Sequence, residues 1–140
     1  PPSPPSPPSP PSPPSPPPPP VCLEGVRATG ITSLNEGAYG ITDPQVWVVD
    51  APGGSVVART EVSFDTITPS YRTALTFPPA AHSASSPLTV CFEVRDDWPP
   101  ANPPLLHSGC GTLVVGMRGE QSVALSAGAT VHVTMCAAAR

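Results

Sequence analysis

The sequence of 140 residues contains no lysine, no run of eighteen apolar residues and no close cysteine pair of the kind that binds a metal. Its six basic residues are all arginines, and ten acidic residues give a net charge of −4. This balance provides no basic surface for nucleic acid and disfavours docking to an anionic membrane. Without a long apolar run, no segment is expected to span a bilayer.

Motifs for catalysis and N-glycosylation are also missing. His82, His107 and His132 have no zinc-site spacing, and no Gly-x-Ser-x-Gly turn is present to anchor a Ser-His-Asp triad. We therefore expect no enzyme. No Asn-x-Ser/Thr site occurs, so any glycan must be O-linked. The sequence begins without methionine or a signal peptide, which suggests a processed or partial piece of a longer protein.

Proline divides the chain into two parts, because fifteen of the 25 prolines lie in residues 1–20. Proline fixes φ and has no amide donor, so this segment, the tail, can enter neither a helix interior nor a sheet. The tail is expected to form a polyproline II rod of about 60 Å, with the serines of the Pro-Pro-Ser repeat along one edge. Residues 21–140 have the length of one domain with its own core.

The unbroken repeat and its final proline block resemble the extensin-like, hydroxyproline-rich glycoproteins of plant and green-algal cell walls. This resemblance covers the tail and implies hydroxylated prolines and O-glycans. The glycosylation candidates are Pro1, Pro2, Ser3, Pro4, Pro5, Ser6, Pro7, Pro8, Ser9, Pro10, Pro11, Ser12, Pro13, Pro14, Ser15, Pro16, Pro17, Pro18, Pro19 and Pro20. The alternative is an unmodified linker, or a ligand for proline-binding domains.

After the tail, short stretches rich in β-branched residues alternate with Gly, Pro, Asn and Asp. We expect strands over residues 21–31, 45–50, 55–63, 71–77, 88–94, 111–117, 121–125 and 130–136. Residues 88–94 alternate strictly between apolar and other side chains, as half-buried strands do. Pro-Gly-Gly within residues 50–57 predicts a hairpin turn. No segment has a sustained helical period, so the fold class is an all-β sandwich.

Four stretches in fixed order resemble the C2 domain family. They are TDPQVWVVD, RTEVSFDTITPSYRTALTF, LTVCFEVRDDW and GCGTLVV. The first differs from the family pattern in having Gln45 in place of tyrosine. The resemblance spans roughly residues 21–115 and implies an eight-stranded antiparallel C2-like sandwich with three loops at one end.

The four cysteines indicate two disulfides and therefore an oxidising, extracellular location. Four buried free thiols are the alternative, and the sequence by itself leaves three connectivities open. The strand order of the resembled family favours Cys91 with Cys110 and Cys22 with Cys136.

The C2 resemblance also raises the question of calcium, because Asp43 and Asp96 match metal-ligand positions of that family and Asp97 is adjacent. The sequence departs from the family where Asn35 or Glu36 replaces an earlier aspartate, and where Trp98 and prolines replace acids. Calcium requires six to eight oxygens, so a partial set is a weak site. The alternative is that Asp43 caps a turn and Asp96 ends a strand, both solvated.

These features predict a secreted structural glycoprotein of a cell wall or extracellular matrix. The sandwich would join subunits, and the tail would act as spacer and carry glycans. Tyr39, Tyr71 and Trp98 are candidate platforms on which the tail of the next copy docks, whereas Trp47 is expected in the core. Such head-to-tail self-association produces an open filament. The alternative is a calcium-dependent module for lipid or carbohydrate on a rigid stalk. No other cofactor is expected.

Overall fold

The structure of the protein is a computed structural model that describes residues 1–17, 19–33, 40–79 and 87–137. The strands in chain order are β1 (Val21–Thr29), β2 (Pro44–Val49), β3 (Val56–Arg59), β4 (Leu75–Phe77), β5 (Leu88–Asp96), β6 (Leu105–Leu113), β7 (Glu120–Ala124) and β8 (Thr130–Met135). A short 3-10 turn, η3 (Ser126–Gly128), separates the last two strands. In the described ranges, no helix is long and apolar enough to cross a membrane.

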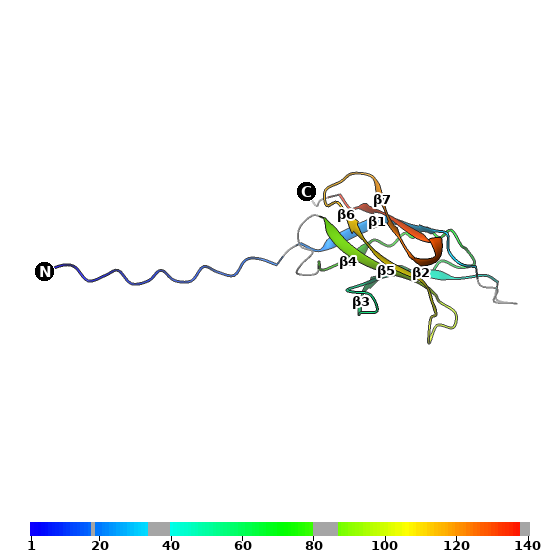
Figure 1. Ribbon diagram of the computed structural model, residues 1–140, viewed down its shortest axis with the longest axis horizontal. Helices are drawn as coiled ribbons and strands as arrows, with labels where there is room; N and C mark the ends of the chain where they lie inside the picture. Colours follow the sequence, from blue (N-terminus) through cyan, green and yellow to red (C-terminus); the bar gives the residue numbers. More distant parts are fainter. Residues whose placement is uncertain (18, 34–39, 80–86, 138–140) are drawn as a thin grey trace.

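The strands form two four-stranded sheets, β4-β1-β8-β7 and β3-β2-β5-β6, in which all paired neighbours are antiparallel. The sheets pack face to face, as Figure 1 shows. This arrangement confirms the prediction of an all-β, eight-stranded antiparallel sandwich.

The core lies between the sheets, where alternate side chains of each central strand point inward. On β5, Leu88, Val90, Phe92 and Val94 are at most 2% exposed. They face the inner side chains of β1 and β8, among them the fully buried Leu23. The inward face expected for residues 88–94 is therefore confirmed, and burial of this apolar area stabilises the fold. The strand is more buried than expected, because Cys91 and Glu93 on its other face are also buried.

The sandwich has two ends, which we call the tail pole and the loop pole. At the tail pole β1 begins, β4 ends and β8 ends, since Val21 pairs with Phe77 and Leu23 with Met135. At the loop pole β2 begins beside the end of β5, since Pro44 pairs with Asp96.

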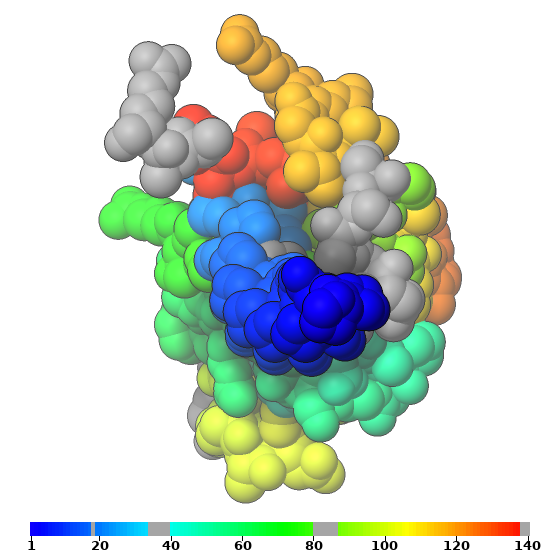
Figure 2. All heavy atoms as spheres, turned by 90° about the vertical axis from the view of Figure 1, so that its left-hand side faces the viewer, coloured from blue at the N-terminus to red at the C-terminus, as the bar shows by residue number. Residues whose placement is uncertain are grey.

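The described residues of the tail are all exposed and belong to no helix or strand. The tail leaves the sandwich as an extended segment in Figure 1, and in Figure 2 it points towards the viewer. Regular pairing begins at Val21, the first residue of the chain after the proline block. Polyproline II geometry for the tail, with residues 1–20 and 21–140 as separate parts, stays a prediction.

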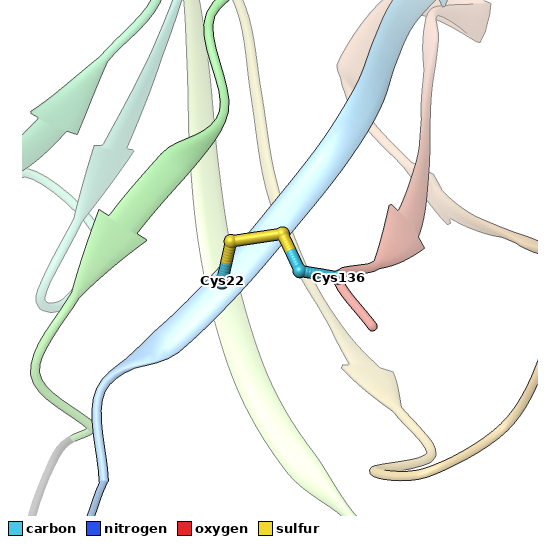
Figure 3. The surroundings of a disulfide bond; sticks show 2 residues. All are labelled: Cys22 and Cys136. Atoms are coloured by element: carbon cyan, nitrogen blue, oxygen red, sulfur yellow. A yellow bond between two sulfur atoms is a disulfide. The ribbon is translucent and has the colours of Figure 1, made fainter. Parts of the chain in front are cut away.

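Both disulfides expected from the sequence are present. Cys22 on β1 is joined to Cys136, which directly follows β8 (Figure 3), and Cys91 on β5 is joined to Cys110 on β6. Cys91 and Cys110 are also direct partners in the ladder between their strands. Two disulfides are compatible with an extracellular protein.

The bounds expected from the sequence are wrong for three strands. The sixth strand was expected over residues 111–117, but β6 spans Leu105–Leu113, and a turn follows it in which Met117 donates to the carbonyl of Val114. Pairing with β5 determines these bounds. The polar and glycine residues in the middle of β6, from His107 to Gly111, obscure the strand in the sequence. The third and fourth strands are also shorter than residues 55–63 and 71–77, because β3 ends at Arg59 and β4 begins only at Leu75.

Glycine in β6 allows this strand to approach β7 of the opposite sheet closely. A Cβ atom on Gly109 would lie 2.7 Å from the carbonyl oxygen of Ala124 and 3.0 Å from Cα of Leu125. A Cβ atom on Gly111 would lie 2.9 Å from a methyl group of Val123. The two glycines therefore close one edge of the sandwich.

We expect Gly109→Ala to lower the free energy of unfolding by about 1 to 3 kcal/mol, because the added methyl group displaces backbone rather than a flexible side chain. Equilibrium urea unfolding measures this change. The control is Thr112→Ala, on the same strand with an exposed side chain, which should stay within about 0.5 kcal/mol. Equal effects of the two substitutions would contradict the close approach.

Candidate functional site

Three connections meet at the loop pole and are joined by backbone hydrogen bonds. Ser63 and Thr66, which follow β3, donate to the carbonyl oxygens of Pro44 and Thr42. Asp97, which follows β5, donates to the carbonyl oxygen of Asp43. The segments before β2, after β3 and after β5 therefore form one connected surface, and it contains the aspartates singled out in the sequence.

Asp96 is the most buried of these aspartates, with 1% of its surface exposed. Its Oδ1 accepts hydrogen bonds from the backbone N–H groups of Asp43 and Trp98, each at 3.2 Å. A buried carboxylate requires such donors. Asp96 thus holds the start of β2 against the loop that follows β5. Asp96 ends a strand, as the alternative to a metal site held, but that alternative was wrong to treat it as solvated, because pairing with Pro44 places it inside the sheet.

Asp43 and Asp65 serve the backbone in the same way. Oδ1 of Asp43 accepts from the N–H of Asp65 at 2.8 Å, and Oδ1 of Asp65 accepts from the N–H of Ile41 at 3.2 Å. Asp65 has a positive φ of 51°, a conformation that aspartate tolerates better than most residues. Asp43 therefore caps a turn, as the alternative to a metal site proposed.

The described residues of the loop pole do not fit a calcium ion. No three His, Cys, Asp or Glu side chains of the described ranges gather closely enough to hold a metal. Asp43 and Asp96 each use a carboxylate oxygen on backbone donors, whereas calcium takes six to eight oxygens. Asn35 and Glu36 lie outside the described residues.

Apolar side chains are exposed at this same pole. Phe64 is 71% exposed and Trp98 45%, and Ile41 and Ile67 are also exposed. Each lies beside one of the hydrogen-bonded aspartates or threonines described above. We call Ile41, Phe64, Ile67 and Trp98 the loop-pole surface. Large apolar side chains exposed at one end of a domain are candidates for contact with a partner.

The other candidate platforms differ from Trp98. Tyr71 was expected as a platform, but it is 6% exposed and its hydroxyl donates to the carbonyl oxygen of Pro44 at 2.6 Å. Burial, followed by the charge of Glu61, raises the pKa of Tyr71. Tyr71 is therefore a core residue, and its hydroxyl is anchored to the start of β2. Tyr39 lies outside the described residues.

Trp47 is half-buried on the outer face of the β3-β2-β5-β6 sheet rather than in the core. The guanidinium carbon of Arg95 lies 4.8 Å from its ring centroid, and that of Arg59 lies 5.3 Å away. Its indole N–H donates to Oε1 of Gln45 at 2.8 Å. Cation–π contacts from neighbouring strands thus cover this ring. The sequence pattern alone did not indicate them.

Two histidines have structural partners. His107 is 1% exposed, and its ring joins the backbone N–H of Thr32 and the carbonyl oxygen of Ser126. His132 hydrogen-bonds through its two ring nitrogens to the hydroxyls of Thr29 and Ser122. His82 lies outside the described residues.

A carboxylate also lies near His132, which brings a Ser-His-Glu grouping onto the outer face of the β4-β1-β8-β7 sheet. Oε1 of Glu120 is 3.7 Å from Nδ1 of His132, but the same carboxylate accepts two hydrogen bonds from Arg27. Hydrogen bonding to Arg27 lowers the pKa of Glu120. The ion pair between Arg27 and Glu120 is therefore lost as the pH falls through this lowered pKa. No sequence motif indicates this grouping, because it forms only when the pairing of β7 with β8 places Ser122 opposite His132.

The tail pole carries an apolar groove of about 260 Å³ between the two sheets. Its walls include Val57, Phe77 and Val90, and Asp50 lies at its rim. The predicted hairpin turn forms part of this pole. There the N–H of Ser55 donates to Oδ1 of Asp50, and the N–H of Asp50 donates to the carbonyl oxygen of Ser55.

Comparison with solved structures identifies the fold as C2-like. One structure described as a C2 domain is 23% identical, with a TM-score of 0.59, over 84% of this chain and 98% of that chain. A C2 domain of plant Extended Synaptotagmin 1 is 17% identical, with a TM-score of 0.63, over 86% and 95%. BON1-C2B is 16% identical, with a TM-score of 0.54, over 84% and 89%. No family model and no curated protein sequence matches the chain.

We expect Asp96→Ala to lower the free energy of unfolding by about 1 to 3 kcal/mol, because two partly buried N–H groups lose their acceptor. Urea unfolding followed by tryptophan fluorescence measures the loss. Asp97→Ala is the matched control, since only the backbone of Asp97 is bonded to Asp43, and it should change stability by less than about 0.5 kcal/mol. A larger loss for Asp97→Ala would refute this assignment.

Proposed function

We propose that this protein is a secreted structural glycoprotein of an extracellular matrix or cell wall. The C2-like sandwich joins subunits, and the tail serves as a spacer that carries O-glycans. The observation that carries this proposal is the position of the loop-pole surface, which lies at the end of the sandwich opposite the exposed tail.

The chemistry of the tail supports a role as a spacer. Its prolines have no N–H group, so the tail cannot add a strand to the edge of a sheet. As a polyproline II rod it would reach about 60 Å with little conformational entropy left to lose on docking. Its ligands are therefore apolar and aromatic surfaces, which pack against proline rings.

The loop-pole surface supplies such a partner for the tail of another copy. Trp98 offers a large exposed ring, and Phe64 and Ile41 are exposed on adjacent loops. The hydrogen bonds of Asp43 and Asp96 hold these loops in place, so the surface is formed before the tail arrives. Preorganisation of both partners reduces the entropic cost of association.

The two interacting parts lie at opposite poles, and this determines the form of the assembly. When the tail of one copy docks on the loop pole of a second copy, the loop pole of the first copy stays available for the tail of a third. Such a contact is heterologous and does not close on itself, so it extends into an open filament.

The alternative function is a calcium-dependent module that binds lipid or carbohydrate through its end loops. Its support is the C2-like fold, which several solved structures described as C2 domains share. The aspartates of the loop pole argue against it, because they are committed to backbone donors. A chelator separates the two functions, because only the alternative requires calcium.

The tail of protein from its native source is expected to carry hydroxyproline with pentose and serine with hexose. Intact-mass analysis before and after chemical deglycosylation measures both. Peptides from residues 21–140 are the internal control and should keep their sequence mass, since no N-glycosylation site is present. A tail of unmodified proline and serine would contradict the glycoprotein part of the proposal.

Electron microscopy and sedimentation of the purified chain are expected to show linear assemblies that persist in chelator. Trp98→Ala should weaken association by about 30-fold, which corresponds to the roughly 2 kcal/mol that buried interface tryptophans contribute. The matched control is Met117→Ala, because Met117 is 48% exposed, close to the 45% of Trp98, but follows β6 at the other pole.

The outcomes separate the alternatives. Dispersed monomers at high concentration would refute the filament. Disassembly by chelator would favour the calcium-dependent function. Equal weakening by Trp98→Ala and Met117→Ala would indicate general hydrophobic association in place of docking at the loop pole.

A further inference from the structure

The disulfide between Cys22 and Cys136 closes the chain where it enters and leaves the sandwich. Only Val21 separates Cys22 from the tail, and Cys136 directly follows β8. The two Cα atoms are 5.3 Å apart although 114 positions separate them in the sequence. A hydrogen bond of 3.0 Å from the N–H of Cys136 to the carbonyl of Cys22 reinforces this closure.

We propose that this bridge gives the protein a further function as a tension-bearing link in which the load passes around the sandwich. A force applied to the two ends of the chain runs from the tail to Cys22, across the two sulfurs and out through Cys136. The residues between the two cysteines lie outside this path, so tension does not stretch them. The inference rests on the proposed structural function and concerns copies that are attached through the tail and through the segment after Cys136. A copy loaded at its loop pole instead carries the force through the sandwich.

The direction in which the strands would otherwise be loaded explains why a bypass matters. β1 begins and β8 ends at the same pole, and they are antiparallel, with Leu23 opposite Met135 and Thr29 opposite Thr130. Without the bridge, a force on the two chain ends would separate this pair from one end. The hydrogen bonds would then break one after another instead of sharing the load.

The loss of β1 would be severe, because β1 is a central strand that pairs with both β4 and β8. Its inward side chains Leu23, Val26 and Ala28 are at most 1% exposed. Removal of β1 would therefore split one sheet and open the core. The bridge lies at the position where this separation would begin (Figure 3).

The second disulfide does not share this role and supplies a control. Cys91 and Cys110 are 19 positions apart and join neighbouring strands inside the loop that Cys22 and Cys136 close. Tension between the chain ends reaches them only if the first bridge is open. Reduction of the first bridge would place the whole sandwich under load, so the link is sensitive to redox conditions.

Single-molecule pulling on the full chain, with handles at residues 1 and 140, tests this inference. The oxidised protein should extend without any unfolding step until a handle detaches. The double variant Cys22→Ser/Cys136→Ser should release a contour length on the order of 300 Å at about 3.3 to 3.6 Å per residue, with the segment between Cys91 and Cys110 still held.

The control is the double variant Cys91→Ser/Cys110→Ser, which should show no step while oxidised. If Cys22→Ser/Cys136→Ser fails to fold, reductant added to the tethered unmodified protein replaces it, and the step should appear after the addition. A step in the oxidised, unmodified protein would overturn the inference, as would the absence of a step after reduction. The measurement uses one molecule, so a failure to form filaments in electron microscopy leaves its result unaffected.

Discussion

The covalent closure of the sandwich by Cys22 and Cys136 is the constraint on which the arrangement of the molecule depends. It holds the first strand to the end of the last strand, at the point where a segment made mostly of prolines, which lack a backbone donor, is followed by a strand that pairs on both sides. A tail that cannot pair contributes no stability of its own to this junction. The bridge and the ladders on both sides of β1 therefore supply the attachment between the two parts.

At the loop pole, aspartates bind the backbone of the loops. The C2-like architecture brings Asp43 and Asp96 together, but their oxygens accept hydrogen bonds from the backbone, which fixes the loops around them. Because these carboxylates organise the loops, the side chains available to a partner are the apolar ones, such as Phe64 and Trp98. The pole thus exposes apolar side chains on loops that buried and half-buried carboxylates hold through backbone hydrogen bonds.

The parts of the fold that could be predicted from the sequence are those with a local turn signal or a strict alternation of apolar residues. The strand over β5 was predictable because its inner residues alternate without exception, and the turn at Asp50 because Pro-Gly-Gly permits little else. The predicted bounds failed where pairing with a neighbouring strand determines where a strand begins and ends. β6 begins at Leu105 only because β5 offers it a ladder, and its glycines are explained by the approach of β7. Tyr71 was expected on the surface and is buried, whereas Trp47 was expected in the core and lies on an outer face. The burial of a ring depends on neighbours that are distant in the sequence.

The amino-acid sequence by itself determined that the chain has an extended, unpaired tail and a domain of alternating strands, because the lack of N–H groups on successive prolines and the period of two are properties of neighbouring residues. The tertiary structure decided which aspartates bind backbone, which aromatic rings remain exposed, and that both chain ends leave the sandwich at one pole. These features arise between residues that are distant along the chain, so no local pattern can encode them.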